Sequence, residues 1–386
     1  MQGANRFQAL DSFRGLFALS VVTYHIGLPG SFTELSFFRN ADLFVEFFFV
    51  LSGFVLAHAY GRKEQVEWRR FFITRSFRLF PLHWLMLLVF IVLEVGKAIA
   101  YRKGIVFNFE PFTGAAAPAQ ILPSFLLIQS WMPFTDPLSF NYPAWSISVE
   151  YYMYMVFMLA LMVSVTARLW VWAAITLLAL AALYFGFGDL TQKSLRGLSC
   201  FFGGALSYMG YRALSARVAP AYRLFTCLEL IAVGLVVALL TSSLDDKVLP
   251  ATVLFCGVVV VYAFDAGAVS HVLKGSAFAL IGKISYSIYM VHAAVWFCIV
   301  SLFMVLQKVS GMPLAPSIGP KRYVDTGSLL LNNLLAVAVL LIVIGLSLYT
   351  YKYVELKGQA LGKRLAARKP AGSAYAASAQ QGPESP

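Results

Sequence analysis

Three ionisable side chains lie inside long apolar stretches of this sequence. His25, Glu46 and Glu150 each belong to a different stretch. An ionisable group is costly to keep in an apolar segment, so each is by default a functional candidate. Histidine exchanges a proton near neutral pH, and a neighbouring carboxylate can orient its ring and raise its basicity. We therefore predict acid–base chemistry at these residues. The alternative is that both acids simply reach water near an interface.

Three arginines extend this set. Arg14 precedes His25 by eleven positions, which on a helix places the two about 20° apart on one face and about 16 Å apart along the axis. Arg75 and Arg78 are three positions apart and would share a helix face. Two planar guanidinium groups suit a phosphate-bearing anion. The alternative is that these arginines only anchor the chain at a membrane surface.

Two polar stripes also occur at helical spacing. The first stripe consists of Ser146, Glu150 and Tyr154, directly after Trp145. The second consists of Gly282, Ser285, Tyr289 and His292. Hydroxyl and imidazole groups on one face of an apolar helix can bind a polar substrate. They can equally hold two helices together, which is the alternative for Ser285 and His292.

The elements that must position these residues are membrane helices. Hydrophobic residues make up 60% of the 386 positions and charged residues 12%, whereas soluble domains carry about 25% charged residues. A hydrocarbon core takes about 20 residues to cross, and we expect spans at 11–28, 41–60, 79–100, 144–166, 169–187, 194–212, 223–241, 250–267, 277–306 and 327–350. The span 277–306 is long enough to be tilted or broken. The predicted fold is an all-α transmembrane bundle of about ten spans.

Charge predicts how the bundle is oriented. With both termini cytoplasmic, 20 of the 30 Lys and Arg residues fall inside and 10 outside, as the positive-inside rule requires. The net charge of +12 then reflects topology, so anionic membrane lipid is the expected partner and nucleic acid is not.

Residues 1–352 form the predicted transmembrane domain, placed in the cell membrane. Residues 353–386 form a cationic and then disordered cytoplasmic tail. The four cysteines are not at metal-ligand spacing, and we expect no metal.

Several of these residues belong to longer motifs. The motifs are, in order, Arg14-Gly15 with His25; Phe48-Phe49-Val50-Leu51-Ser52-Gly53-Phe54; Arg75-x-x-Arg78 followed by Pro81; Trp145-Ser146-x-Ser148-x-Glu150; and Ser285-Tyr286-Ser287-x-Tyr289-x-x-His292. In this order they resemble the acyltransferase-3 family of membrane proteins. Two positions depart from the family pattern: Glu46 stands where Asp is usual, and His83 stands where an aromatic residue is usual.

The resemblance implies transfer of an acyl group, most often acetyl, from coenzyme A to a hydroxyl of a sugar or similar acceptor. Acetyl-CoA is therefore the expected donor. Arg75 and Arg78 would hold its phosphates on the cytoplasmic side, with Arg14 nearby, and its pantetheine arm would run outward toward His25.

The resemblance also implies roles at the outer side. His25 is the expected general base, oriented by Glu150 or Glu46, although a covalent acyl-His25 intermediate stays open. The acceptor would be a carbohydrate or glycoside that enters past the loop 101–143. Its expected contacts are Trp145, Ser146, Tyr289 and His292. The identity of the acceptor, the position acylated, the acyl group and the oligomeric state stay open.

Two other classes of protein remain as alternatives. A transporter or flippase could use the buried histidines and acids as a proton relay. It would have no affinity for coenzyme A and no need for the arginine pair. A non-catalytic membrane scaffold would tolerate the loss of His25 and Glu150.

Overall fold

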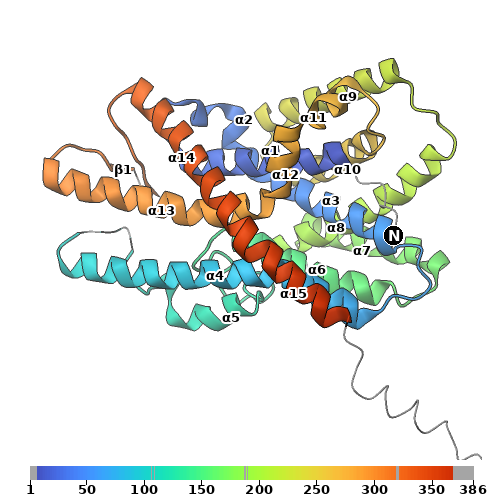
Figure 1. Ribbon diagram of the computed structural model, residues 1–386, viewed down its shortest axis with the longest axis horizontal. Helices are drawn as coiled ribbons and strands as arrows, with labels where there is room; N and C mark the ends of the chain where they lie inside the picture. Colours follow the sequence, from blue (N-terminus) through green and yellow to red (C-terminus); the bar gives the residue numbers. More distant parts are fainter. Residues whose placement is uncertain are drawn as a thin grey trace, which may run out of the picture.

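The computed structural model describes residues 7–367, apart from 106, 108, 187, 189, 319 and 320. The described residues form a bundle of helices (Figure 1). Its long helices are α1 (Gln8–Ile26), α3 (Phe44–Tyr60), α4 (Trp68–Arg102), α6 (Ala144–Ala160), α7 (Val165–Phe185), α8 (Gln192–Ser215), α9 (Tyr222–Thr241), α10 (Val248–Ala263), α13 (Ser285–Ser310) and α14 (Leu329–Thr350).

Shorter elements connect the long helices. They are η1 (Phe32–Glu34), α2 (Ser36–Arg39), η2 (Ala41–Leu43), η3 (Gly114–Ala116), η4 (Pro118–Gln120), α5 (Ile121–Phe125), α11 (Ala268–Leu273), α12 (Ser276–Lys283), the π-helical turn η5 (Tyr351–Glu355) and α15 (Leu356–Ala367). The two-residue strands β1 (Ser317–Ile318) and β2 (Lys321–Arg322) pair antiparallel, with Ser317 opposite Arg322.

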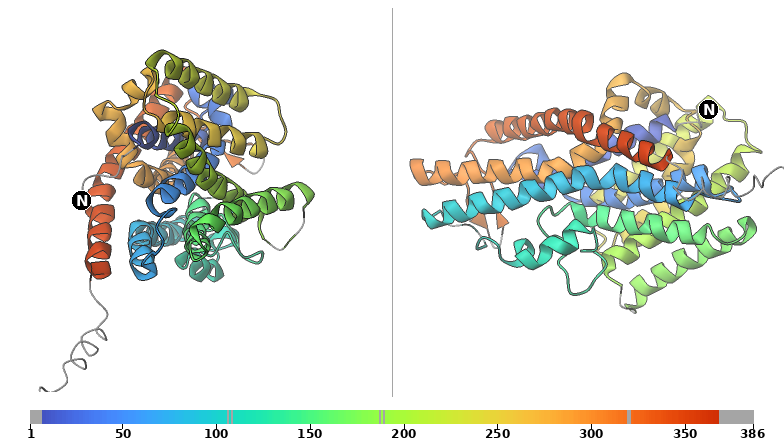
Figure 2. Two further views of the ribbon diagram at one scale, coloured as in Figure 1. Left: turned by 90° about the vertical axis from the view of Figure 1, so that its right-hand side faces the viewer. Right: turned by 60° about the horizontal axis from the view of Figure 1, so that its bottom comes forward.

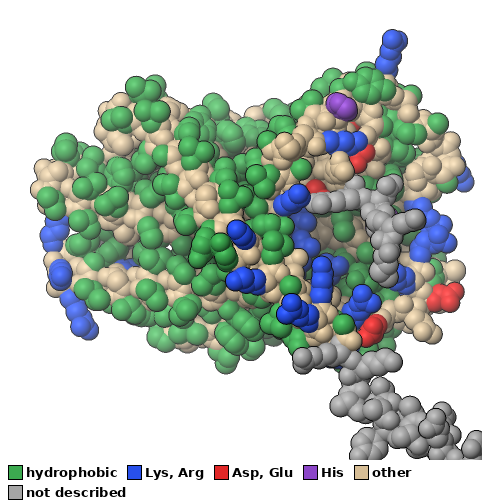
Figure 3. Space-filling view, in the orientation of Figure 1, with side chains coloured by type: hydrophobic (Ala, Val, Ile, Leu, Met, Phe, Trp, Pro, Cys, Tyr) green, Lys and Arg blue, Asp and Glu red, His purple; other side chains and the backbone are tan. Residues whose placement is uncertain are grey.

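The helical composition of the described part confirms the predicted fold class. Six of its helical segments are long and apolar enough to cross a membrane: Ala41–Tyr60, Trp68–Arg102, Val165–Phe185, Tyr222–Thr241, Ser285–Ser310 and Leu329–Ala367. Leu330, Leu341 and many other apolar side chains on them are exposed, and apolar side chains cover most of the face in Figure 3. The protein is therefore a membrane protein. Each predicted span overlaps a helix, but the count of ten spans and the sides of the two termini stay predictions.

Helix α4 begins earlier than predicted. The expected span started at residue 79, yet the helix starts at Trp68, so the basic stretch treated as a loop forms its first turns. Arg75 and Arg78 consequently share a helical face, as their spacing predicted. Helix α15 packs on this part of α4 (Figure 1). A Cβ on Gly358 would lie 2.7 Å from Pro81 Cγ, and one on Gly362 would lie 2.4 Å from Phe77 Cβ.

Glycines also bring α1 against the start of α13. The expected span 277–306 is divided at Ile284 into α12 and α13. At this break a Cβ on Gly15 would lie 2.6 Å from the Gly282 nitrogen, and one on Gly282 would lie 2.3 Å from the Asp11 oxygen. Only backbone-to-backbone contact fits there, so Gly282 serves helix packing. The contact aligns the polar face of α1 with the polar stripe of α13.

Two helices run beside each other toward the end of the molecule opposite α15. Helices α4 and α13 are in contact and extend side by side along the long axis (Figure 2). The segment 103–143 follows α4 and returns to the start of α6. Tyr142, near the end of this segment, packs against His25 on the last turn of α1.

Candidate active site

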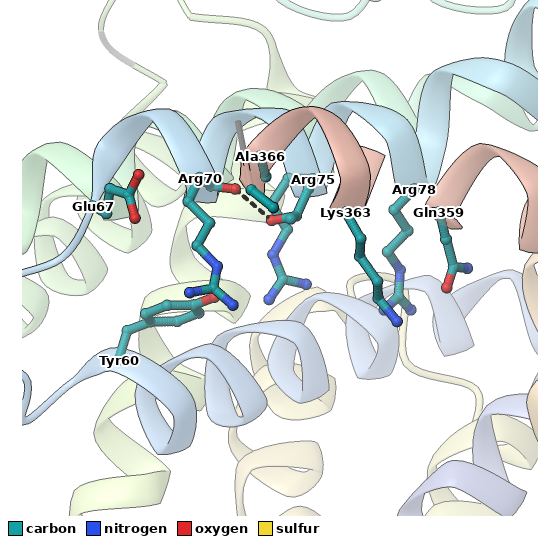
Figure 4. Close-up of a pocket in the computed structure, with 10 residues that line it drawn as sticks. Tyr60, Glu67, Arg70, Arg75, Arg78, Gln359, Lys363 and Ala366 are labelled. Atoms are coloured by element: carbon teal, nitrogen blue, oxygen red, sulfur yellow. Dashed lines mark hydrogen bonds between the residues drawn. The ribbon is translucent and has the colours of Figure 1, made fainter. Parts of the chain in front are cut away.

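A cationic cavity of about 710 Å³ lies between α4, α15 and the end of α3. It is lined by Tyr60, Glu67, Arg70, Thr74, Arg75, Arg78, Gln359, Lys363, Ala366 and Ala367. Figure 4 shows the Arg70, Arg75, Arg78 and Lys363 side chains directed into one space. In Figure 3 Lys and Arg side chains gather around α15. Four cations face one carboxylate here, so the cavity suits an anion with several charges.

Aromatic rings hold one of these arginines in place. The Arg75 guanidinium carbon lies 5.5 Å from the centre of the Tyr154 ring, 5.7 Å from that of Phe71 and 6.0 Å from that of Tyr60. A guanidinium group is attracted to ring faces at such distances. The Arg75 Nε atom has no hydrogen-bond partner among the described residues. The guanidinium is therefore positioned but keeps donor capacity for a ligand.

A second cavity, of about 530 Å³, meets the first at Arg78 and Gln359. Arg14, Lys283 and Glu355 also line it. Glu355 lies in the π-helical turn η5 and accepts a hydrogen bond from Ser287 Oγ. π-helical turns recur at functional sites. Each of the two cavities has a volume that ligand sites of proteins commonly have.

Arg14 connects these cavities to the centre of the bundle. It shares a narrow space of about 30 Å³ with Arg75 and Arg78. It shares another of about 40 Å³ with Glu150 and Tyr289. Each is roughly the volume of one water molecule. The predicted arginines are thus brought together, and a narrow polar path leads from them toward α6 and α13.

Hydrogen bonds tie the middle of this path together. Ser52 Oγ donates to Glu150 Oε1 at 2.7 Å, and the Tyr154 hydroxyl donates to the same oxygen. Ser146 Oγ donates to the Tyr289 hydroxyl at 2.9 Å. The polar stripes of α6 and α13 therefore face each other, as a shared site requires.

Two histidines lie next to Tyr289, which lines the second of these narrow spaces. The rings of His25 and His292 are 5.2 Å apart between centroids and inclined by 23°. Tyr142 packs against both, at 4.7 Å from His25 and 6.0 Å from His292, and the Tyr289 ring is 5.9 Å from His292. His292 is buried, and neither of its ring nitrogens has a hydrogen-bond partner within the described residues. Buried polar atoms normally have hydrogen-bond partners. The two ring nitrogens of His292, beside His25, are therefore suited to bind a polar ligand.

Each of the two carboxylates has its own set of partners in the structure. Glu150 lines one narrow space with Arg14, Ser146 and Tyr289, and it accepts hydrogen bonds from Ser52 and Tyr154. Its predicted depth beside His25 and its role stay predictions.

Glu46 belongs to a different cluster. It is fully buried and forms an ion pair with Arg196 of α8, which also donates from Nε at 2.7 Å. Trp145 stands over the same cluster, with Lys193 Nζ 4.4 Å and the Arg196 guanidinium 6.0 Å from its ring centre. A buried carboxylate needs a counter-charge, and Arg196 supplies it. Glu46 and Trp145 therefore share the Arg196 cluster, and their predicted roles beside His25 stay predictions.

Comparison with known proteins identifies the family. The family model that describes an acyltransferase domain matches residues 7–352, which is most of the chain. The chain belongs to the acyltransferase-3 family. Neither the transporter nor the scaffold alternative is favoured by this match.

Two curated relatives share shorter regions. Acyltransferase MdmB of Streptomyces mycarofaciens is 32% identical over 164 residues, which are 39% of this chain and 38% of that protein. Protein 2 in picA locus of Rhizobium radiobacter is 44% identical over 88 residues, which are 21% of this chain and 42% of that protein. The chain thus matches less than half the length of either relative. No solved structure matches this acyltransferase-3 chain.

Several residues of the site escaped sequence reasoning. Lys363 and Gln359 lie beyond the last apolar run, where the charges were assigned to a tail. Tyr142 stands three residues before the predicted Trp145, and no periodic pattern marks it. Loop residues show no helical spacing, so only their contacts identify them. His83, left without a role, hydrogen-bonds the Ser124 carbonyl oxygen through Nε2 at 2.7 Å and anchors the α5 segment.

Exchanging Gly362 for Leu is expected to weaken coenzyme A binding about tenfold or more. The new side chain would meet Phe77, so α15 must move away from α4 and take Lys363 out of the cationic cavity. Loss of one charge-assisted hydrogen bond costs about 1.5–3 kcal/mol, and about 1.4 kcal/mol is tenfold in affinity. The measurement is calorimetric titration of the purified protein with coenzyme A. Gly345→Leu is the matched control, because its Cβ meets nothing within 4 Å. Equal affinity in the two variants would exclude α15 from the donor site.

Exchanging Glu46 for Gln is expected to destabilise the fold by about 3 kcal/mol, the lower end of the range for breaking a buried ion pair. The lower end applies because the Arg196 side chain is 23% exposed. Thermal unfolding in detergent measures the effect. Glu34→Gln, whose partner Arg39 is 61% exposed, should change little. A Glu46→Gln protein with normal unfolding and no turnover would instead make Glu46 a catalytic residue.

Proposed function

We propose that this membrane acyltransferase transfers an acyl group, acetyl by default, from coenzyme A to a hydroxyl of a carbohydrate or glycoside. One observation carries the proposal. Arg14 borders one space with Arg75 and Arg78 and another with Tyr289, whose ring lies 5.9 Å from that of His292, so neighbouring residues connect the cationic cavity to the histidine pair. A donor with a polyanionic end and a reactive thioester at the other end suits these two groups of residues.

The donor's phosphates would bind in the cationic cavity. Arg70, Arg75, Arg78 and Lys363 supply four positive charges around it. The Tyr60 ring lies in the cavity wall, where a nucleotide base can stack. We place this cavity on the cytoplasmic side, because that orientation puts most of the Lys and Arg residues inside. Both termini then lie inside as well.

The thioester would be carried toward His25 past Arg14, and the side chains there would move apart to admit it, because the spaces beside Arg14 have volumes of only about 30 and 40 Å³. Arg14 and His25 lie on the same helix, α1, and the line from Arg14 to His25 gives the proposed direction of the pantetheine arm. His25 accepts the proton of the acceptor hydroxyl as its oxygen attacks the thioester carbonyl carbon. The new C–O bond replaces the C–S bond, and the proton passes from His25 to the departing sulfur. The products are an acyl ester and coenzyme A.

The remaining polar groups would hold the reacting partners. The unsatisfied nitrogens of His292 and the unsatisfied Oδ1 atom of Asn141 offer hydrogen bonds to a hydroxylated acceptor. Ser146 and Tyr289 continue this surface toward Glu150. Glu150, bonded to Ser52 and Tyr154, would keep Arg14 in place by its charge. Glu46 and Trp145 would support the site from the α8 side.

The proposal is tested by comparing cells that contain the protein with cells that contain its His25→Ala variant. Mass spectrometry of glycans and small glycosides should find a species heavier by one acetyl group in the first cells. Coenzyme A should be released by the purified wild-type protein in the presence of that acceptor. If the acylated species forms equally with the variant, the proposed active site is wrong. If it forms with neither, the proposed activity is wrong.

A further inference from the structure

A further large cavity, distinct from the two described above, has a volume of about 540 Å³. Tyr142 in its wall lies beside His25. We call it the lateral groove. It lies between α4, α13 and the segment 105–143, and its walls are mainly aromatic and aliphatic, including Phe90, Phe140, Trp296, Phe297 and Met304. Ligand sites commonly have volumes of about 300–1,000 Å³ and apolar walls with a few polar groups. The groove meets both criteria, and the mechanism above does not use it.

The lateral groove reaches the proposed site of chemistry. Tyr142 lines the groove, and the same ring lies 4.7 Å from His25 and 6.0 Å from His292 between centroids. Asn141 Nδ2 donates to the Met290 carbonyl oxygen at 3.1 Å and ties this turn to α13. A ligand in the groove would therefore have one end beside the reacting histidine.

The backbone around the groove is held in an unusual conformation. Phe140, in the groove wall, has a φ of 52°, and Phe112 has a φ of 57°. Residues other than glycine pay about 1–2 kcal/mol for this left-handed region, and such strain clusters at ligand sites. Hydrogen bonds maintain it: Phe140 N donates to the Ala115 oxygen at 3.2 Å, and Phe112 N donates to Glu94 Oε2 at 3.1 Å.

One buried ion pair interrupts the apolar walls. Lys97 Nζ lies 3.2 Å from Glu94 Oε1, and the two side chains are 9% and 8% exposed. Both residues line the groove, on α4. Apart from this pair, the polar side chains in the lining are Thr113, Asp136, Tyr142 and Ser301, against a larger number of aromatic and aliphatic ones. A hydroxyl-rich sugar chain would lose water there without gaining enough hydrogen bonds. An apolar body would gain contact area in the same space.

We infer that the acceptor is amphipathic: a sugar hydroxyl reaches His25 while an apolar aglycone fills the lateral groove. This inference rests on the proposed function and narrows its acceptor. Both α4 and α13 are candidate membrane spans, with apolar side chains such as Val92 and Leu302 exposed beside the groove. An acceptor dissolved in the membrane can therefore approach it from the lipid side. The aglycone can belong to a free glycoside or to a membrane glycolipid, since both have this chemistry.

The experiment fills the groove with a side chain. Ser301 lines the groove, whereas the next residue, Leu302, is 54% exposed on the outer surface. Membranes from cells with wild-type protein, Ser301→Trp or Leu302→Trp are supplied with radiolabelled acetyl-CoA. Labelled product is then separated into organic-soluble and water-soluble polymeric fractions. We expect organic-soluble product with the wild type and Leu302→Trp, and at least a tenfold loss with Ser301→Trp.

The outcomes separate this inference from the proposed function. Label that enters only water-soluble polysaccharide, undiminished in Ser301→Trp, would overturn the amphipathic acceptor but keep the acyltransferase. No labelled product in any membrane would overturn both. Thin-layer chromatography of the organic fraction distinguishes a small glycoside from a membrane lipid. Coenzyme A affinity, measured on all three proteins, should be unchanged; a loss confined to Ser301→Trp would indicate misfolding. In that case the wild-type protein is photolabelled with octyl glucoside that carries a diazirine in its alkyl tail. Crosslinks at Trp296 or Phe297 would support binding of the aglycone in the lateral groove. Crosslinks elsewhere would overturn it.

Discussion

Replacing His25 by Ala should reduce acyl transfer by about 10²- to 10⁴-fold, the usual effect of losing a general base. Coenzyme A affinity should stay close to that of the wild type, because His25 does not line the cationic cavity. A hydroxyl is a weak nucleophile near neutral pH, so its proton must be accepted as the C–O bond forms. Initial rates of coenzyme A release and calorimetric titration measure the two quantities. His271→Ala is the control, since that side chain is exposed on α11.

Two companion variants distinguish His25 from its neighbours. His292→Ala should mainly raise the KM for the acceptor, because His292 is proposed to bind the hydroxyl rather than take its proton. Glu150→Gln should lower turnover less than His25→Ala, since Glu150 is proposed to act through Arg14 and its hydroxyl partners. Near-normal transfer in His25→Ala with total loss in Glu150→Gln would make Glu150 the base. If neither change matters, the reaction takes place elsewhere.

Removing Arg75 and Arg78 together should weaken coenzyme A binding by about 100-fold or more. In the proposed complex each guanidinium would make charge-assisted hydrogen bonds worth about 1.5–3 kcal/mol, and about 1.4 kcal/mol is tenfold in affinity. Lysine at either position should restore only part of the affinity, because an ammonium group cannot form the planar, bidentate hydrogen bonds that a guanidinium group makes to phosphate. Titration of the purified double variant with coenzyme A measures the effect.

The control for this prediction is a double change of cations that line no donor cavity. Arg39 stands on α2 and Arg322 on β2, and neither lines the cationic cavity. Arg39→Ala with Arg322→Ala therefore lowers the net charge equally. Coenzyme A affinity should survive that change. Equal loss in both double variants would show a general effect of charge. No loss in Arg75→Ala with Arg78→Ala would leave the pair as membrane anchors.

Local sequence determined the helices and the residues on each helical face. Apolar runs of sufficient length form helices in the structure because backbone groups in a membrane must be satisfied within the segment. The three-residue spacing of Arg75 and Arg78 predicted that they share a face, and both line the cationic cavity. The stripe of Ser146 and Glu150 likewise forms one polar surface, since helical periodicity depends only on neighbouring positions.

Tertiary structure alone decided which faces meet. Glu46 was expected near His25 but pairs with Arg196, because the contact of α3 with α8 brings that cation to it. A Cβ on Gly53 would lie 1.8 Å from the Phe201 oxygen, so this approach depends on a missing side chain.

The partners of His25 and of the arginines came from elements that periodicity does not describe. Tyr142 lies in a loop, and Lys363 lies in a helix beyond the last apolar run. Periodicity along one helix determines the direction of a side chain. The residue that it faces depends on packing between segments far apart in the chain, and that information is present only in the folded protein.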